Sequence, residues 1–150
     1  MTKFLLAVHV LAAILAVGPV AVAASMFPPT ARRALGTPDA TTGTAALRLL
    51  HRICRVYALV GVVVPVFGFA TARQLGVLGS AWLIVSIGLT VLAAVVLGAL
   101  VLPAQSALLE GSADRAGPIA RLAAFTGLFN LLWATVTVLM IVRPGSATGA

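Results

Sequence analysis

The chain has 150 residues, of which 61% are hydrophobic and only 9% are charged, against roughly 25% charged residues in an average soluble domain. Together with a mean hydropathy of +1.15, this excludes an ordinary soluble domain and indicates a polytopic membrane protein with one transmembrane domain, residues 1–150. The formal net charge of +7 does not indicate nucleic-acid binding, because the basic residues stand beside apolar segments and not in a stripe with interleaved aromatic residues.

The first predicted helix covers about residues 4–27, within an uncharged run that exceeds the ~20 residues needed to cross a bilayer. We expect Pro28 and Pro29 to end it. A run of this length argues against a cleaved signal peptide. One face carries His9 among alanines, where a second helix can approach closely. The bulky face, which suits lipid, consists of Phe4, Val8, Leu11 and Leu15.

The second predicted helix covers about residues 47–71, but only residues 56–72 are uncharged. Its first part therefore lies at the membrane edge. Three arginines one or two turns apart are expected to contact lipid headgroups there: Arg48, Arg52 and Arg55. The alternative for these arginines is a dedicated site for an anion or a substrate. His51 belongs to the same interfacial turn, and Pro65 predicts a kink.

The third predicted helix covers about residues 78–102 and ends at Pro103, and the fourth covers about 119–142. Polar residues at spacings of three and four in the fourth helix predict a stripe that faces the protein, where hydrogen bonds between helices explain most such patterns. Thr126 belongs to this stripe. The predicted polar interior consists of Ser86, Asn130, Trp133 and Thr137.

Four helices with short links predict an all-α, antiparallel four-helix transmembrane bundle. Arginines are concentrated beside the first and third loops, whereas only Lys3, Arg73 and Arg143 lie at the opposite ends. The positive-inside rule then places both termini outside the cytoplasm. The arginines beside the two loops are Arg32, Arg33, Arg48, Arg52, Arg55, Arg115 and Arg121.

A cofactor held between the two histidines is disfavoured by their depth. His9 is predicted near one membrane boundary and His51 at the other, about 25 Å apart, so they do not share one haem iron or copper ion. A site that uses His9 with groups at its own level stays open: Trp82, Ser86, Trp133 and Thr137.

Acid–base catalysis is also disfavoured, because the membrane segments contain no Asp, Glu or Lys. A carboxylate proton relay and an acid to orient His9 are therefore both missing, which argues against hydrolysis. The single cysteine, Cys54, excludes an internal disulfide and a thiolate metal cage.

Three short segments resemble those of a family of small bacterial integral membrane proteins: HVLAAILAVG, LVLPAQSALLEG and LMIVRP. The family is distantly similar to the copper-resistance D proteins and the membrane protoporphyrinogen oxidases. The resemblance implies a location in the bacterial inner membrane and makes His9 the first-helix histidine, a candidate haem or copper ligand. The chain departs from the pattern in having no second histidine at matching depth and in having Arg143 where lysine is usual.

We therefore expect a non-enzymatic accessory or structural membrane protein that contacts lipid and a partner membrane protein or a second copy of itself. The alternative is a haem- or copper-binding protein that uses His9 and is redox-active. A small transporter is the third hypothesis, which the lack of charge inside the membrane disfavours.

Overall fold

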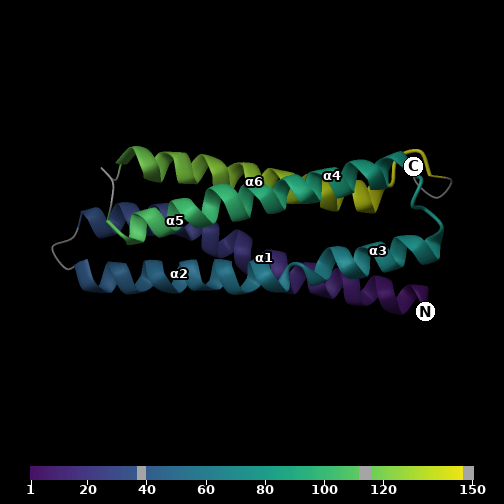
Figure 1. The fold of residues 1–150 in the computed structure, drawn as a ribbon, viewed down its shortest axis with the longest axis horizontal. Helices are drawn as coiled ribbons and strands as arrows, with labels where there is room; N and C mark the ends of the chain where they lie inside the picture. Colours follow the sequence, from purple (N-terminus) through teal and green to yellow (C-terminus); the bar gives the residue numbers. More distant parts are fainter. Residues whose placement is uncertain (37–39, 112–115, 147–150) are drawn as a thin grey trace.

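The computed structural model describes residues 1–36, 40–111 and 116–146. Within these residues, four helical stretches are long and apolar enough to cross a membrane: Thr2–Leu35, Thr41–Leu75, Ala81–Leu109 and Gly117–Val142. Figure 1 shows them running alongside one another in alternating directions, with both termini at the same end. The predicted all-α four-helix bundle is confirmed.

The first and last spans are single helices, α1 (Thr2–Leu35) and α6 (Ala116–Val142). The second span consists of α2 (Ala40–Val60) and α3 (Val63–Leu75). The third consists of α4 (Ala81–Val95), a π-helical segment η1 (Val96–Val101), and α5 (Leu102–Leu109). We call the end of the bundle opposite the two chain termini, where α1 and α5 end and α2 and α6 begin, the loop end.

The prediction that Pro28 and Pro29 end the first helix is wrong, because α1 continues through both prolines to Leu35. Phe27 and Pro28 are buried, and Ala31 is only 4% exposed. Packing between helices therefore outweighs the proline penalty, as it does at many prolines in membrane helices.

The predicted kink near Pro65 is present as a break between α2 and α3. In a regular helix, the ring of Pro65 would clash with the carbonyl of Gly61, four residues earlier. Instead, the Gly61 carbonyl accepts a hydrogen bond from the backbone N–H of Val64 at 3.1 Å. The chain thus tightens locally and satisfies the carbonyl that proline would leave free.

Pro103 does not end the third span, which continues to Leu109. The π-helical segment η1 ends at Val101, two residues before Pro103. At its end, the backbone N–H of Leu102 bonds to the carbonyl of Leu97, five residues back. This wider turn shifts the hydrogen-bond register ahead of Pro103, so the proline enters the helix at its first turn, where its missing N–H costs little. The third span is therefore longer than predicted.

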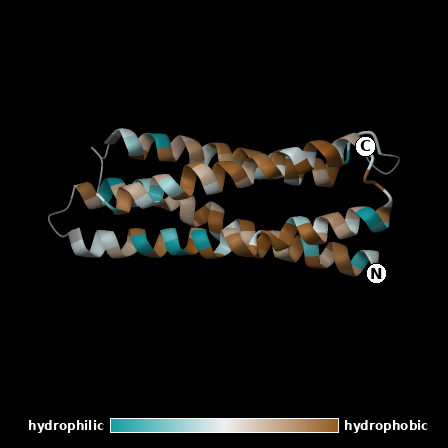
Figure 2. Cartoon of the chain, in the orientation of Figure 1, coloured by the Kyte–Doolittle hydropathy of each residue, from teal (hydrophilic) through white to brown (hydrophobic). Residues whose placement is uncertain are grey.

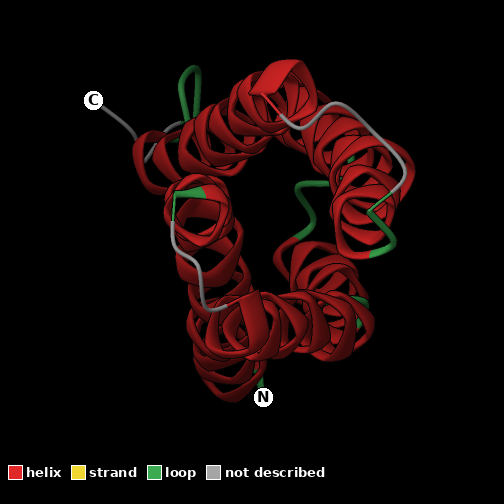
Figure 3. Ribbon diagram, turned by 90° about the vertical axis from the view of Figure 1, so that its left-hand side faces the viewer, coloured by secondary structure: helices red, strands yellow, loops and turns green. Residues whose placement is uncertain are grey.

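The main core lies toward the loop end, where all four spans contribute buried side chains. There α1 packs on α2 and α6, α2 packs on α5, and α6 packs on η1 and α5. At the other end, α3 packs mainly on α1, and α4 packs mainly on α6. Figure 3, an end view, shows the helices surrounding a common axis. Figure 2 shows apolar residues along most of the bundle and hydrophilic residues gathered in α2 near the loop end.

Candidate functional site

His9 points into the protein, as predicted, but its partner is the backbone of α3. Its Nδ1 lies 2.9 Å from the carbonyl oxygen of Val64, so Nδ1–H donates to that carbonyl. Gly68 lies against the imidazole, since a Cβ atom there would be only 2.8 Å from Cε1 of His9. The lipid-facing assignment of Phe4, at 65% exposed, agrees with this orientation of α1. His9 therefore joins α1 to α3 beside the helix break.

The predicted polar interior is only partly inside. Ser86 is fully buried and donates to the Trp82 carbonyl at 2.7 Å. Asn130 donates to the Ser25 hydroxyl at 2.9 Å and so links α6 to α1, and Trp133 donates to the Asn130 side-chain oxygen at 3.3 Å.

Thr137 is exposed and does not belong to the interior. Its hydroxyl donates to the carbonyl of Trp133, one turn back in the same helix, at 2.9 Å. This bond inside the helix satisfies the hydroxyl, so Thr137 can face lipid without a partner on another span.

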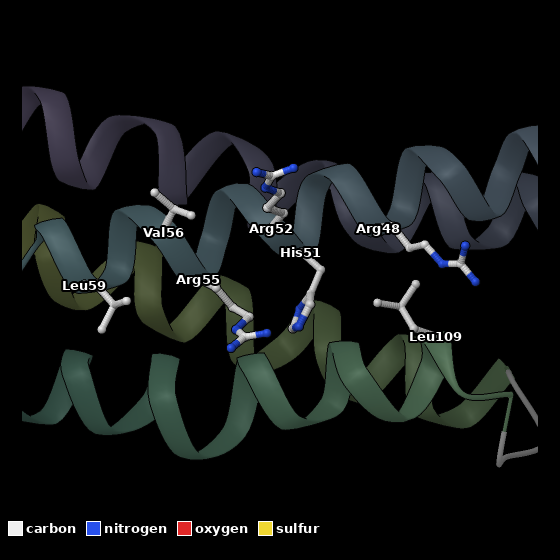
Figure 4. A pocket seen from close by; sticks show the side chains of 7 residues that line it. All are labelled: Arg48, His51, Arg52, Arg55, Val56, Leu59 and Leu109. Carbon is white, nitrogen blue, oxygen red and sulfur yellow. The ribbon is translucent and has the colours of Figure 1, made fainter.

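A groove of about 450 Å³ lies between α2 and α5 near the loop end. It is polar along one part and apolar along the other. Figure 4 shows the side chains of His51 and Arg55 reaching from α2 toward α5, whereas that of Arg52 points the other way. The groove is lined by Arg48, His51, Arg52, Arg55, Val56, Leu59 and Leu109.

His51 is held in the groove by two residues of α5. Its Nδ1 lies 2.9 Å from Oε1 of Gln105, an acceptor, so Nδ1 carries the proton. Its Nε2 is then the acceptor and faces the Ser106 hydroxyl at 3.3 Å. The Gln105 amide donates in turn to Sγ of Cys54 at 3.6 Å. Since Gln105 and Cys54 are fully buried, this chain of hydrogen bonds fixes both the tautomer and the position of His51.

The arginines of the groove are exposed and have no carboxylate within salt-bridge distance in the part of the chain that the structure describes. Glu110 is the only acidic residue in that part, and Asp39 and Asp114 lie outside it. Arg48 and Arg55 are seven positions apart, or about 10 Å along α2. The groove therefore concentrates positive charge at the edge of an apolar span, a setting suited to an anion.

Nucleophilic catalysis fits the same residues less well. Ser106, His51 and Gln105 have the order of nucleophile, base and orienting group. However, Ser106 does not line the groove, and a neutral amide stands where a carboxylate would stabilise a charged imidazole. Among the described residues, no group of three or more His, Cys, Asp or Glu side chains could hold a metal ion.

Sequence reasoning identified the three arginines but missed the partners of His51. Gln105 and Ser106 were placed in a loop because Pro103 was expected to end the third helix. Their depth in the membrane could have predicted this contact. Because α5 runs antiparallel to α2, polar residues just beyond the third apolar run lie at the same membrane level as His51. The separation of the two histidines agrees with the prediction, since His51 precedes Val64, the partner of His9, by about 20 Å of helix.

No protein-family model, curated protein or solved structure matches this chain. The resemblance to the small bacterial membrane proteins, with its implied role for His9, thus remains a prediction.

The contact between His9 and Gly68 generates a stability prediction. In Gly68→Ala, the new methyl group displaces the imidazole and breaks its bond to Val64, a loss of about 0.6–2 kcal/mol that offsets the gain of up to about 1 kcal/mol from replacing glycine in a helix. The matched control is Gly88→Ala in α4, where a Cβ meets no atom within 4 Å.

Thermal unfolding in detergent should show Gly88→Ala at least as stable as the unmodified protein, and Gly68→Ala clearly less stable than Gly88→Ala. Equal melting temperatures for the two variants would mean that His9 does not brace α3.

Proposed function

We propose that this protein is a non-enzymatic accessory or structural component of the membrane, anchored at its loop end by phosphate headgroups of anionic lipids. The observation that carries the proposal is a set of exposed arginines at the edge of the second span that have no carboxylate partner among the residues the structure describes: Arg48, Arg52 and Arg55. Guanidinium groups bind phosphate by charge and paired hydrogen bonds. Partner contact through the exposed apolar faces, with another membrane protein or a second copy, is part of the same role.

The loop end also defines the proposed orientation. Arg32, Arg33 and Arg121 lie at the same end as the groove, while Lys3 and Arg143 lie at the other; Arg115 is outside the described residues. By the positive-inside rule the loop end faces the cytoplasm, and both termini face the opposite side. We place the protein in the bacterial inner membrane on the resemblance stated above.

Anionic lipid should stabilise the protein through the groove. In nanodiscs, replacing a tenth of the phosphatidylcholine with phosphatidylglycerol should raise the melting temperature, and the triple variant R48Q/R52Q/R55Q should lose most of this rise because each arginine contributes about 1 kcal/mol of attraction to an anionic surface. Added salt should reduce the rise as well. A triple variant that responds to the anionic lipid as the unmodified protein does would contradict the proposal.

The orientation can be measured by cysteine labelling in a Cys54→Ala background. A cysteine at Thr2 should react with a membrane-impermeant maleimide in intact spheroplasts, whereas one at Gly36 should react only after the membrane is opened. The reverse pattern would refute the orientation.

Haem or copper binding by His9 is the second candidate. The observation in its favour is that Nδ1–H donates to a backbone carbonyl, the arrangement usual for metal-binding histidines, which leaves Nε2 as the ligand atom. The protein purified from haem- and copper-supplied cells should then show a Soret band or bound copper that His9→Ala lacks. Background absorbance and background copper would exclude this candidate.

A further inference from the structure

We propose that the groove between α2 and α5 is a site for one phospholipid whose anionic phosphodiester headgroup carries a hydroxyl group, and that His51 recognises this hydroxyl. The inference rests on the proposed attraction of anionic lipid and adds a defined position, a stoichiometry and a headgroup preference. It is carried by the charges of the groove, its apolar continuation and the hydrogen bonds of His51.

The position of the phosphate follows from the basic side chains. Arg55 and His51 both reach toward α5, and Arg48 lies one turn of α2 farther toward the loop end (Figure 4). The phosphate is seated beside Arg55. Arg48, whose side chain extends toward the loop end and away from Arg55, adds to the positive field of the groove. Arg52, whose side chain points away from α5, contributes to the general field and not to this seat.

The position of an acyl chain follows from the apolar residues. Val56 and Leu59 continue the groove from Arg55 toward the middle of the second span, and they are 48% and 76% exposed. A lipid thus finds charged groups and apolar groups in the order in which its own headgroup and chain are arranged. A free phosphate ion would use only the first part of the groove.

The preference for a hydroxyl follows from the fixed tautomer of His51. Because Nδ1–H is directed at Gln105, Nε2 presents a lone pair, which accepts a hydrogen bond and repels a second acceptor. Its present partner, the Ser106 hydroxyl, is 3.3 Å away, which is long for a hydroxyl donor. Because this contact is long and Ser106 is only half-buried, a headgroup hydroxyl that enters the groove can displace Ser106 and donate to Nε2, whereas the bare phosphate of phosphatidic acid offers mainly acceptors.

Gln105 acts as a positioning residue. It is fully buried and does not line the groove, so it does not touch the lipid. Its replacement by leucine removes the acceptor for Nδ1–H and frees the imidazole to rotate or change tautomer. The headgroup preference should then weaken, although every charge of the groove is still present.

The test is native mass spectrometry of the full chain in detergent, with phosphatidylglycerol and phosphatidic acid of identical acyl chains in competition and phosphatidylcholine as the neutral reference. Phosphatidic acid carries at least as much negative charge, so attraction by charge alone favours it. We expect one retained phosphatidylglycerol per protein, preferred about fivefold over phosphatidic acid, as one hydrogen bond permits.

The variants separate the site from the general field. His51→Ala and Gln105→Leu should remove the preference between the two anionic lipids, and Arg55→Gln should reduce retention of both about tenfold. Arg121→Gln is the matched control, because it removes the same charge at the same end of the bundle but lies outside the groove. It should change neither quantity.

Two results would overturn the site while leaving the proposed function in place: equal or better retention of phosphatidic acid by the unmodified protein, or an effect of Arg121→Gln as large as that of Arg55→Gln. Retention of neither anionic lipid above phosphatidylcholine would overturn both.

Discussion

Backbone hydrogen bonding without water is the constraint on which this structure depends, because an unpaired amide or carbonyl in the hydrocarbon region costs several kcal/mol. Each proline in a span removes one backbone donor, and the helix geometry changes in a different way near Pro65 and near Pro103. The helix breaks at Gly61 ahead of Pro65, and it widens into η1 ahead of Pro103. Both changes in helix geometry lie next to the contacts of the two histidines. Val64, which His9 contacts, lies just after the break, and the wide turn leads into the segment that holds Gln105 beside His51.

Composition and periodicity were sufficient for the fold class, the span number and the inward direction of His9. They were insufficient for helix ends, because the rule that proline stops a helix belongs to an isolated helix, whereas Phe27 and Ala31 gain enough packing to carry α1 onward. The groove was half predictable. Its arginines follow from charge at a membrane edge, but the partnership of His51 with Gln105 requires the length of the third span, which depends on the π-helical segment.

The arginines of the groove and the main packed core lie at the same end of the bundle. A cluster of guanidinium groups repels itself, and no carboxylate in the described part of the chain lies within salt-bridge distance of it. The core at this end is well packed, since Cys54 and Leu122 are fully buried in it. The uncompensated charge becomes useful because the bilayer surface supplies the counter-charge.

The break between α2 and α3 divides the bundle into two mechanically different halves. The loop-end half is cross-braced, with α2 against α5 and α1 against α6, whereas α3 leans mainly on α1. A thinner or thicker bilayer would tilt the spans, and the break at Gly61 lets α3 change direction separately from α2, which is held against α1 and α5. The fold thus separates accommodation to the surrounding lipid sheet from the fixed geometry around His51.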